Sequence, residues 1–311
     1  MMPRILILPP QIAGPAGQLG VRADRGLLDP RPRVSLLNTC YNAQAVVGNV
    51  YFDLTRVFNA HGPAVALASG QAVVYYRVAI MSKDGDWVIR ETAAACAHVL
   101  DVLADRGASY RPGAPLDLRW LAAGWSSHFE FADEKRRRVR CDFFSRPPRI
   151  EVARLAQFFT AEADPLTVVD LDSLIRMKRT QRAKDYAVIG ELATRLCPAE
   201  EILVTTNPDR LLELARDHAQ ETARPAVRAA AAGDRDRVVV ALAREQDRYQ
   251  RADRARLEAY AAAAEPYLAG FGRISPEERR LPDGHARVRS LADRWLPVTV
   301  DLPETDDVDV E

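Results

Sequence analysis

Between Tyr41 and about Cys197, short apolar runs alternate with segments whose apolar residues recur at helical spacing. This alternation is typical of a sheet flanked by helices, so we expect an α/β (α+β) domain with a mixed sheet. Strands are expected at Ala64–Ala68, Asp86–Arg90, Leu116–Leu121, His128–Ala132 and Val139–Ser145. The last two flank a charged turn, which predicts an antiparallel hairpin. Helices are expected at Gln71–Arg77, Thr92–Gly107, from a cap at Asp170 or Asp172 to Arg179, and at Ala183–Leu196.

Composition divides the rest of the chain. Residues 1–40 are rich in Pro, Gly and Arg without sustained periodicity, and we expect a loosely ordered extension there. Residues 41–198 would form the α/β domain. Residues 199–300 are rich in Ala, Arg, Asp and Glu, which favours a helical region packed on that domain. Residues 301–311 carry only acidic charges and are expected to form a solvated tail.

Charge and composition exclude several classes of protein. The 43 basic and 43 acidic residues cancel, so binding of nucleic acid would need a local patch. The hydrophobic fraction of 48% argues against a wholly disordered chain. The absence of an 18-residue apolar window and of a secretion signal argues against a membrane partner. The four cysteines form no CxxC pair, which favours reduced thiols and a cytoplasmic location.

Small residues follow the first expected strand at Ser69-Gly70, where a helix is expected to begin. Small side chains let a backbone approach a phosphate closely, and the free N–H groups at a helix start favour an anion. The same dipeptide is also common as a plain turn.

Three aspartates are the candidate catalytic residues. Asp84 and Asp86 stand at i and i+2 at a strand edge, so both carboxylates would point to one face and could hold Mg²⁺ through oxygen ligands. Asp142 lies inside an apolar strand, where a bare charge is costly and needs a partner or a metal. The alternatives are an ordinary turn at Asp84-Gly85-Asp86, and an ion pair of Asp142 with Arg140 or Arg146.

At these residues the chain resembles the nucleotidyltransferase-fold superfamily, and more closely the bacterial AbiEii abortive-infection nucleotidyltransferases. That family shows a small-residue turn, an Asp-x-Asp pair, a distal Asp, and a Lys-rich helix followed by Arg-x-Lys-Asp. Here the last elements are a helix containing Lys178 and then Arg182-Ala183-Lys184-Asp185. The resemblance covers residues 60–197, and it implies a nucleotidyltransferase-like mixed sheet with a helical C-terminal extension.

The resemblance also implies roles by position. Asp84, Asp86 and Asp142 would bind Mg²⁺ and catalyse transfer of an NMP from an NTP to a hydroxyl acceptor, with Asp142 helping to deprotonate that acceptor. The nucleotide-binding residues would be Ser69, Gly70, Lys83, Lys178 and Asp185. The acceptor would be a tRNA end or a partner protein, in a toxin–antitoxin or phage-defence system.

Two departures from the family pattern keep a second function open. Ile80 stands where a family Arg precedes the aspartates, so Arg77 or Lys83 would have to supply the positive charge. Gly85 replaces an apolar residue and should loosen the strand. The alternative is therefore a catalytically degenerate protein that serves as a binding or antitoxin-like interaction module.

Three further features have plain structural explanations. An Arg182–Asp185 ion pair is as well supported as contact of either residue with a ligand. His128 is expected to be a strand residue with a satisfied hydrogen bond. The basic run Lys135–Arg138 is most simply a solvated hairpin tip, although it could touch the phosphates of an RNA acceptor.

Overall fold

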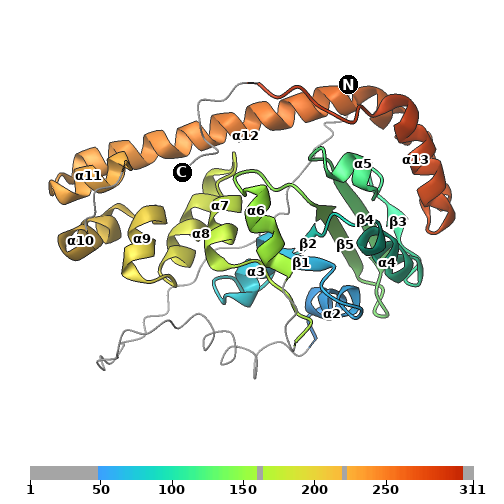
Figure 1. The fold of residues 1–311 in the computed structure, drawn as a ribbon, viewed down its shortest axis with the longest axis horizontal. Helices are drawn as coiled ribbons and strands as arrows, with labels where there is room; N and C mark the ends of the chain where they lie inside the picture. The colour runs from blue at the N-terminus through green and yellow to red at the C-terminus, as the bar shows by residue number, and fades with distance from the viewer. Residues whose placement is uncertain (1–47, 160–163, 219–222, 304–311) are drawn as a thin grey trace.

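A computed structural model of the protein describes residues 48–159, 164–218 and 223–303. Its centre is a five-stranded mixed sheet in the order β1-β2-β5-β4-β3 (Figure 1). The strands are β1 (Val65–Ala68), β2 (Gly85–Ile89), β3 (Ser109–Tyr110), β4 (Ser126–Ala132) and β5 (Arg138–Phe144). Only the β2–β5 pair is parallel in this sheet, and the other neighbouring pairs are antiparallel. The expected α/β class and the expected hairpin, now β4–β5, are both confirmed.

Helices cover both faces of the sheet and extend away from it. They are α2 (Val50–Phe58), α3 (Ser69–Tyr75), α4 (Ala93–Ala104), α5 (Leu118–Leu121), α6 (Val152–Leu155), α7 (Leu171–Met177), α8 (Ala183–Ala193), α9 (Pro198–Val204), α10 (Pro208–His218), α11 (Pro225–Ala231), α12 (Arg235–Phe271) and α13 (Asp283–Trp295). Short 3-10 turns lie at Ala156–Phe159 and Glu277–Arg279. Asp170 caps α7, because its carboxylate accepts the N–H of Ser173 at 2.9 Å.

The expectation of a strand at Leu116–Leu121 is wrong, because Leu118–Leu121 forms the short helix α5. The reason is local. The carboxylate of Asp117 accepts the N–H of Arg119 at 2.9 Å and so caps the first turn. Trp120 and Leu121 lie on this helix and are fully buried. The apolar run therefore indicated burial correctly but not the type of element.

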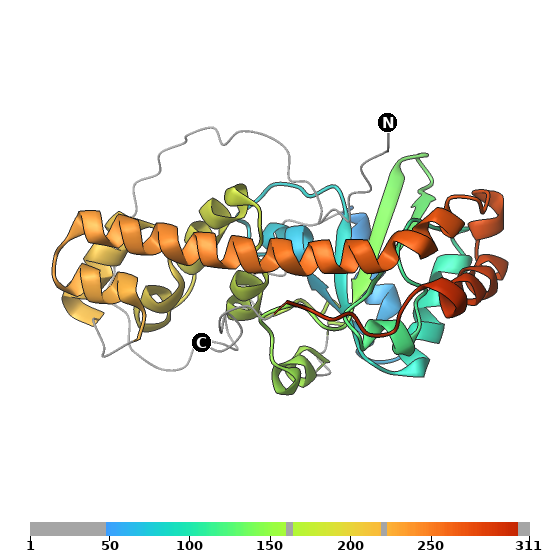
Figure 2. The same ribbon diagram turned by 90° about the horizontal axis from the view of Figure 1, so that it is seen from above.

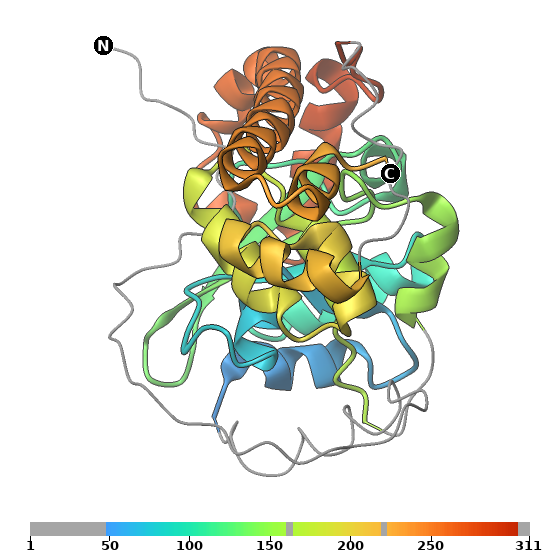
Figure 3. The same cartoon turned by 90° about the vertical axis from the view of Figure 1, so that its left-hand side faces the viewer.

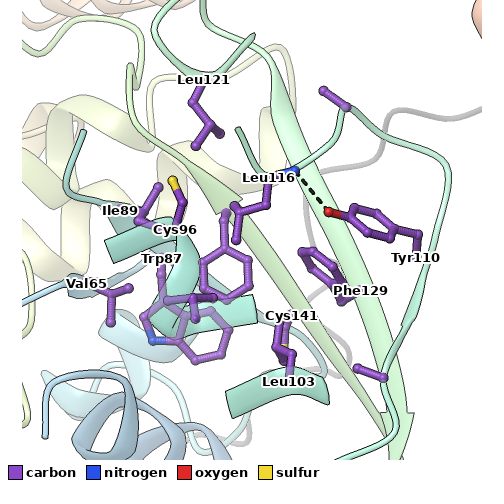
Figure 4. Close-up of a cluster of buried hydrophobic side chains, with 14 of the residues drawn as sticks. Val65, Trp87, Ile89, Cys96, Leu103, Tyr110, Leu116, Leu121, Phe129 and Cys141 are labelled. Atoms are coloured by element: carbon purple, nitrogen blue, oxygen red, sulfur yellow. Dashed lines mark hydrogen bonds between the residues drawn. The ribbon is translucent and has the colours of Figure 1, made fainter. Parts of the chain in front are cut away.

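One face of the sheet carries the larger hydrophobic core (Figure 4). Trp87 of β2, Cys141 of β5 and Phe129 of β4 project to this face, where α2 and α4 cover them. The opposite face packs against α7 and α8 in a second apolar cluster that includes Val88 of β2. Because side chains alternate along a strand, the even-numbered residues around Asp86 and Asp142 lie on this second face.

The helix α12 runs along the whole molecule (Figures 1 and 2). Its N-terminal part packs through Val238 on α10 and α11, which form a third apolar cluster with α9. Figure 3 looks onto that end of the molecule. Its middle contributes Tyr249 to the cluster around α7 and α8. Its C-terminal part inserts Tyr267 and Phe271 into the core that also contains Trp87. The C-terminal region is thus helical, as expected.

Some expectations concern residues that the structure does not describe. The N-terminal extension 1–40 lies outside the described residues, as do residues 304–311 of the acidic tail. The boundary near residue 198 stays a prediction. Among the helices of the described part of the chain, none combines the length and the apolar character needed to cross a bilayer.

Candidate active site

The parallel pairing of β2 with β5 brings two of the three candidate aspartates together. Asp86 is the direct register partner of Asp142, so the two side chains project side by side from neighbouring strands. Asp84 precedes Asp86 by two residues and its charge acts on Asp86, as does that of Asp142. All three aspartates are buried. Residues 56 positions apart in the sequence therefore share one acidic patch.

Basic side chains surround this patch. Arg140 of β5 lies 3.4 Å from the carboxylate of Asp84. Arg111 donates to Oδ1 of Asp142 at 3.0 Å, and Nδ1 of His128 lies 2.9 Å from the same oxygen. The partners of Asp142 are thus neither of the two arginines considered from the sequence. Arg140 does form an ion pair, but with Asp84.

Burial dominates the electrostatics of the two aspartates on β2. Burial raises the pKa of Asp86 well above its ordinary value, and the neighbouring charge of Asp142 raises it further. Burial also raises the pKa of Asp84, although Arg140 opposes this. Oδ2 of Asp86 is buried and has no hydrogen-bond partner in the structure. A buried carboxylate oxygen without a partner is destabilising and fits a position that a cation would occupy.

The acidic patch does not have the geometry of a metal site in this structure. Within residues 48–159, 164–218 and 223–303, no three His, Cys, Asp or Glu side chains are gathered closely enough to hold a metal ion. The ion pairs of Asp84 with Arg140 and of Asp142 with Arg111 direct these carboxylates toward arginines. The donor chemistry nevertheless fits Mg²⁺, which prefers carboxylate oxygens and commonly uses only one or two of them.

The Ser69–Gly70 turn connects β1 to α3 beside this patch. Ser69 adopts a positive φ of 47°, which is uncommon for a residue with a side chain. Gly70 is buried, and a Cβ at this position would lie 2.2 Å from Oγ of Ser82. Position 70 therefore requires glycine, because Ser82, in the segment before Asp84, packs directly against it. Ser69 lines the same pocket as Asp86 and Asp142.

The remaining predicted residues divide into two groups. Lys178 is buried, and its pKa is lowered by burial while the charges of Asp185 and Asp86 oppose this. Asp185 is fully buried, receives a hydrogen bond from Thr180 at 2.7 Å and pairs with Arg182 at 3.1 Å, so the structural ion pair is present. Lys83 is exposed, and its carbonyl accepts a hydrogen bond from Tyr51 at 2.5 Å. Lys178 is thus a buried residue near the acidic patch, whereas Lys83 is exposed to solvent.

A pocket of about 210 Å³ opens over the acidic patch. Ser69, Asp86 and Asp142 are among its polar lining residues, together with Ser126 and His128 of β4. The helix α12 supplies another group of lining residues, which are Asp253, Arg256, Leu257, Tyr260, Ala264, Tyr267 and Leu268. The sequence did not indicate this contribution of α12. Its period of apolar residues indicates a buried stripe but not which surface that stripe covers.

The comparisons with known proteins give little. No protein-family model matches the chain, and no curated protein matches it. Two solved structures from Helicobacter pylori are similar. JHP933 is 10% identical, with a TM-score of 0.36 over 68% of this chain and 94% of that one. A proposed nucleotidyltransferase is 11% identical, with the same TM-score over 66% and 95%. Similarity at this level carries no argument about function, which must come from the site.

Proposed function

We propose that the protein is a Mg²⁺-dependent nucleotidyltransferase that moves an NMP from an NTP to a hydroxyl acceptor. The observation that carries the proposal is the parallel register of Asp86 and Asp142, both of which line a pocket. The unpartnered Oδ2 of Asp86 supports it, because a bound cation would supply the partner that this buried oxygen lacks in the structure.

In this proposal Asp84, Asp86 and Asp142 would hold the metal, which requires their carboxylates to draw closer together than they lie in the structure. Mg²⁺ bound there would neutralise the charge that develops in an in-line displacement at the α-phosphate. The chain's own residues do the rest. Ser69 and Gly70 contact phosphate oxygens, and Lys178 places a positive charge beside Asp86. Asp185 would orient the cationic group formed by Arg182 and Lys178, and the exposed Lys83, next to Asp84, would meet the outer phosphates.

The wider setting rests on the sequence resemblance alone. We propose an AbiEii-like enzyme of a toxin–antitoxin or phage-defence system, acting in the cytoplasm where NTP and Mg²⁺ are available. The acceptor would be a tRNA end or a partner protein. The exposed hairpin tip at Lys135–Arg138 offers positive charge to an RNA acceptor, although Arg138 already pairs with Glu130 and Arg137 with Asp133.

A second candidate function is a catalytically degenerate interaction module. The ion pairs Arg140–Asp84 and Arg111–Asp142 favour it, because they neutralise two of the carboxylates without a metal. The site would then be a structural remnant. Gly85 does not add to this case. A Cβ there would lie 2.5 Å from the ring of Tyr51, so glycine is required by packing.

Thermal denaturation with each of the four NTPs, with and without Mg²⁺, separates the two candidates. An enzyme should be stabilised by NTP only when Mg²⁺ is present, by about 2.7 kcal/mol at a ligand concentration 100 times Kd. The variant Asp84→Asn/Asp86→Asn should lose this stabilisation and the release of pyrophosphate. Asp101→Asn, an exposed carboxylate on α4, is the matched control and should keep both. A wild-type protein indifferent to all four NTPs with Mg²⁺ would reject the enzyme.

A further inference from the structure

A serine, a histidine and an aspartate follow one another at 3.0 Å or less in the candidate active site, and we call these three side chains the relay. Oγ of Ser126 lies 3.0 Å from Nε2 of His128, and Nδ1 of His128 lies 2.9 Å from Oδ1 of Asp142. The strands produce this arrangement directly. Ser126 and His128 are two residues apart on β4, so they share a face, and His128 is the register partner of Asp142. The relay continues the row that Asp86 and Asp142 form across β2 and β5.

The contacts of the imidazole place a hydroxyl at one nitrogen and a negative charge near the other. Nδ1 lies 2.9 Å from the carboxylate of Asp142 without the alignment of a hydrogen bond, so the carboxylate acts on the ring through its charge. Nε2 is at hydrogen-bond distance from the Ser126 hydroxyl, which donates to it in the tautomer that carries its proton on Nδ1. In the general chemistry of nucleophilic catalysis, a hydroxyl held against a neutral imidazole that a carboxylate orients is an activated nucleophile.

The loop after β3 fixes the histidine in place. The N–H of Arg111 donates to the carbonyl of His128, and the N–H of Ala114 donates to that of Ser126, both at 2.9 Å. Between them Gly113 passes directly over the ring, since a Cβ there would lie 2.3 Å from Cδ2 of His128. Tyr267 of α12 donates to the carbonyl of Gly113 at 2.8 Å and holds this loop down. Three hydrogen bonds and the close approach of Gly113 therefore hold the loop against the relay.

Ser126 also faces the space where a substrate would bind. It is partly exposed and lines the same pocket as Ser69, Asp86 and Asp142. Its neighbour Ser127 is fully buried on the opposite face of β4, and its hydroxyl has no hydrogen-bond partner. Two adjacent serines thus differ completely in their access to the pocket.

We propose that Ser126 is an internal acceptor of the nucleotidyl group, which rests on the function proposed above. Oγ of Ser126 attacks the α-phosphorus of the bound NTP and forms a P–O bond. The bond from the α-phosphorus to the bridging oxygen breaks, and pyrophosphate leaves. The hydroxyl proton passes to Nε2 of His128, and Asp142 stabilises the imidazolium. The product is a protein that carries one NMP as a phosphodiester on Ser126.

The surroundings favour phosphoryl chemistry over acyl chemistry at Ser126. The pocket presents the carboxylates of Asp86 and Asp142. With bound Mg²⁺ these groups would attract the phosphates of a nucleotide, whereas the same carboxylates would oppose the negative charge of the oxyanion in an ester intermediate. Arg111 donates to Oδ1 of Asp142, the same oxygen that lies 2.9 Å from Nδ1 of His128.

The experiment incubates the full-length protein with each α-³²P-labelled NTP and Mg²⁺, then measures label on the protein and pyrophosphate in solution. Peptide mapping by mass spectrometry locates the modified residue. Ser126→Ala should lose the protein-bound label, and Ser126→Thr, which keeps a hydroxyl, should recover part of it on residue 126. The matched control Ser127→Ala should label like the wild type. His128→Gln should label on the order of 100-fold more slowly.

The outcomes separate the two proposals. One NMP on Ser126 that is lost in Ser126→Ala supports the internal acceptor. Stabilisation by Mg²⁺–NTP without any label on the protein, or label that persists in Ser126→Ala, overturns the internal acceptor and leaves the nucleotidyltransferase intact. Absence of stabilisation, label and pyrophosphate together overturns both. Equal losses in Ser127→Ala and Ser126→Ala also overturn the internal acceptor, because the effect would then reflect damage to β4.

Discussion

At the scale of single residues, Asp86 is a position where the proposed function conflicts with the stability of the fold. Its carboxylate is buried beside Asp142, and one of its oxygens has no hydrogen-bond partner. A fold selected for stability alone would place an apolar side chain here, as Val88 is placed two residues later on the same face. Asp86 is therefore better explained by a ligand that neutralises it than by packing.

The first prediction concerns this charge. Asp86→Asn should raise the free energy of unfolding in a chelating buffer at neutral pH, on the order of 1–3 kcal/mol, because a buried unpartnered charge is removed. Because the folded pKa of Asp86 is raised, its protonated form is stabilising. That stability is complete below the ordinary value of 3.8 and is lost as pH rises through the folded pKa. Urea unfolding from pH 4 to pH 8 should show this decline in the wild type and a smaller one in Asp86→Asn.

Asp101→Asn is the control for that experiment, since this exposed carboxylate should leave the pH profile unchanged. A remaining decline in Asp86→Asn is expected from Asp84, whose pKa is also raised by burial. If Asp86→Asn were less stable than the wild type in chelator, the carboxylate would have a partner in the protein and the case for a cation would fail.

Some of the site could be read from single residues, and some could not. Period 2 places Asp84 and Asp86 on one face, and an acidic residue in the apolar run around Asp142 needs a partner, so their grouping was a reasonable prediction. The contacts of Arg111 and His128 depend on the pairing of β3 with β4 and of β4 with β5. The turn at Asp133–Arg137 sets the register of β4 with β5, whereas no local signal in the sequence sets the pairing of β3 with β4. The one available signal was the Ser126-x-His128 spacing in a strand that forms a hairpin with the strand of Asp142.

At the scale of elements, α12 does more than extend the chain. Its C-terminal part fills the sheet core through Tyr267 and Phe271, and the face between Asp253 and Leu268 forms a wall of the pocket. The OH of Tyr260 donates to the carbonyl of Ala123 at 2.7 Å, which ties the helix to the segment before β4. A helix far along the sequence thus completes the site that β2, β4 and β5 begin.

The second prediction tests whether α12 belongs to the core of the sheet. Phe271→Ala removes a side chain that is 1% exposed and should lower the free energy of unfolding by about 3–5 kcal/mol. Val239→Ala on the same helix removes a side chain that is 41% exposed and should change it by less than about 0.5 kcal/mol. Urea denaturation measures both. Equal, small effects would show that the C-terminal half of α12 is an appendage.

Element types were predictable where the periodicity was long. The helices α4, α7 and α8 and the hairpin β4–β5 lie within a few residues of their expected positions. The prediction of a strand at Leu116–Leu121 was wrong because a short apolar run fits either a strand or one helical turn. The cap at Asp117 decides in favour of the helix. The composition of residues 199–300 predicted helical structure but not the single long helix α12. An Ala-rich sequence also does not show which surface a helix packs against.

At the scale of the whole molecule, three apolar clusters are joined by one helix. Val238, Tyr249 and Tyr267 of α12 belong to the cluster of α9–α11, the cluster of α7 and α8, and the sheet core respectively. A 37-residue helix is roughly 55 Å long, which allows it to span all three. The relative positions of the pocket wall and of the acidic patch therefore depend on the continuity of this helix.

The last prediction breaks that continuity at an exposed position. Arg254→Pro removes a backbone hydrogen bond in the middle of α12 and should lower the free energy of unfolding by about 3 kcal/mol or more. The two ends of the helix would then no longer unfold cooperatively, so we expect two unfolding transitions instead of one. Stabilisation by Mg²⁺–NTP should also weaken, because Arg256, Leu257 and Tyr260 would leave the pocket wall.

Arg254→Ala keeps the helix and should behave like the wild type in calorimetry. One sharp transition with unchanged ligand stabilisation in Arg254→Pro would show that the three clusters are held together without α12.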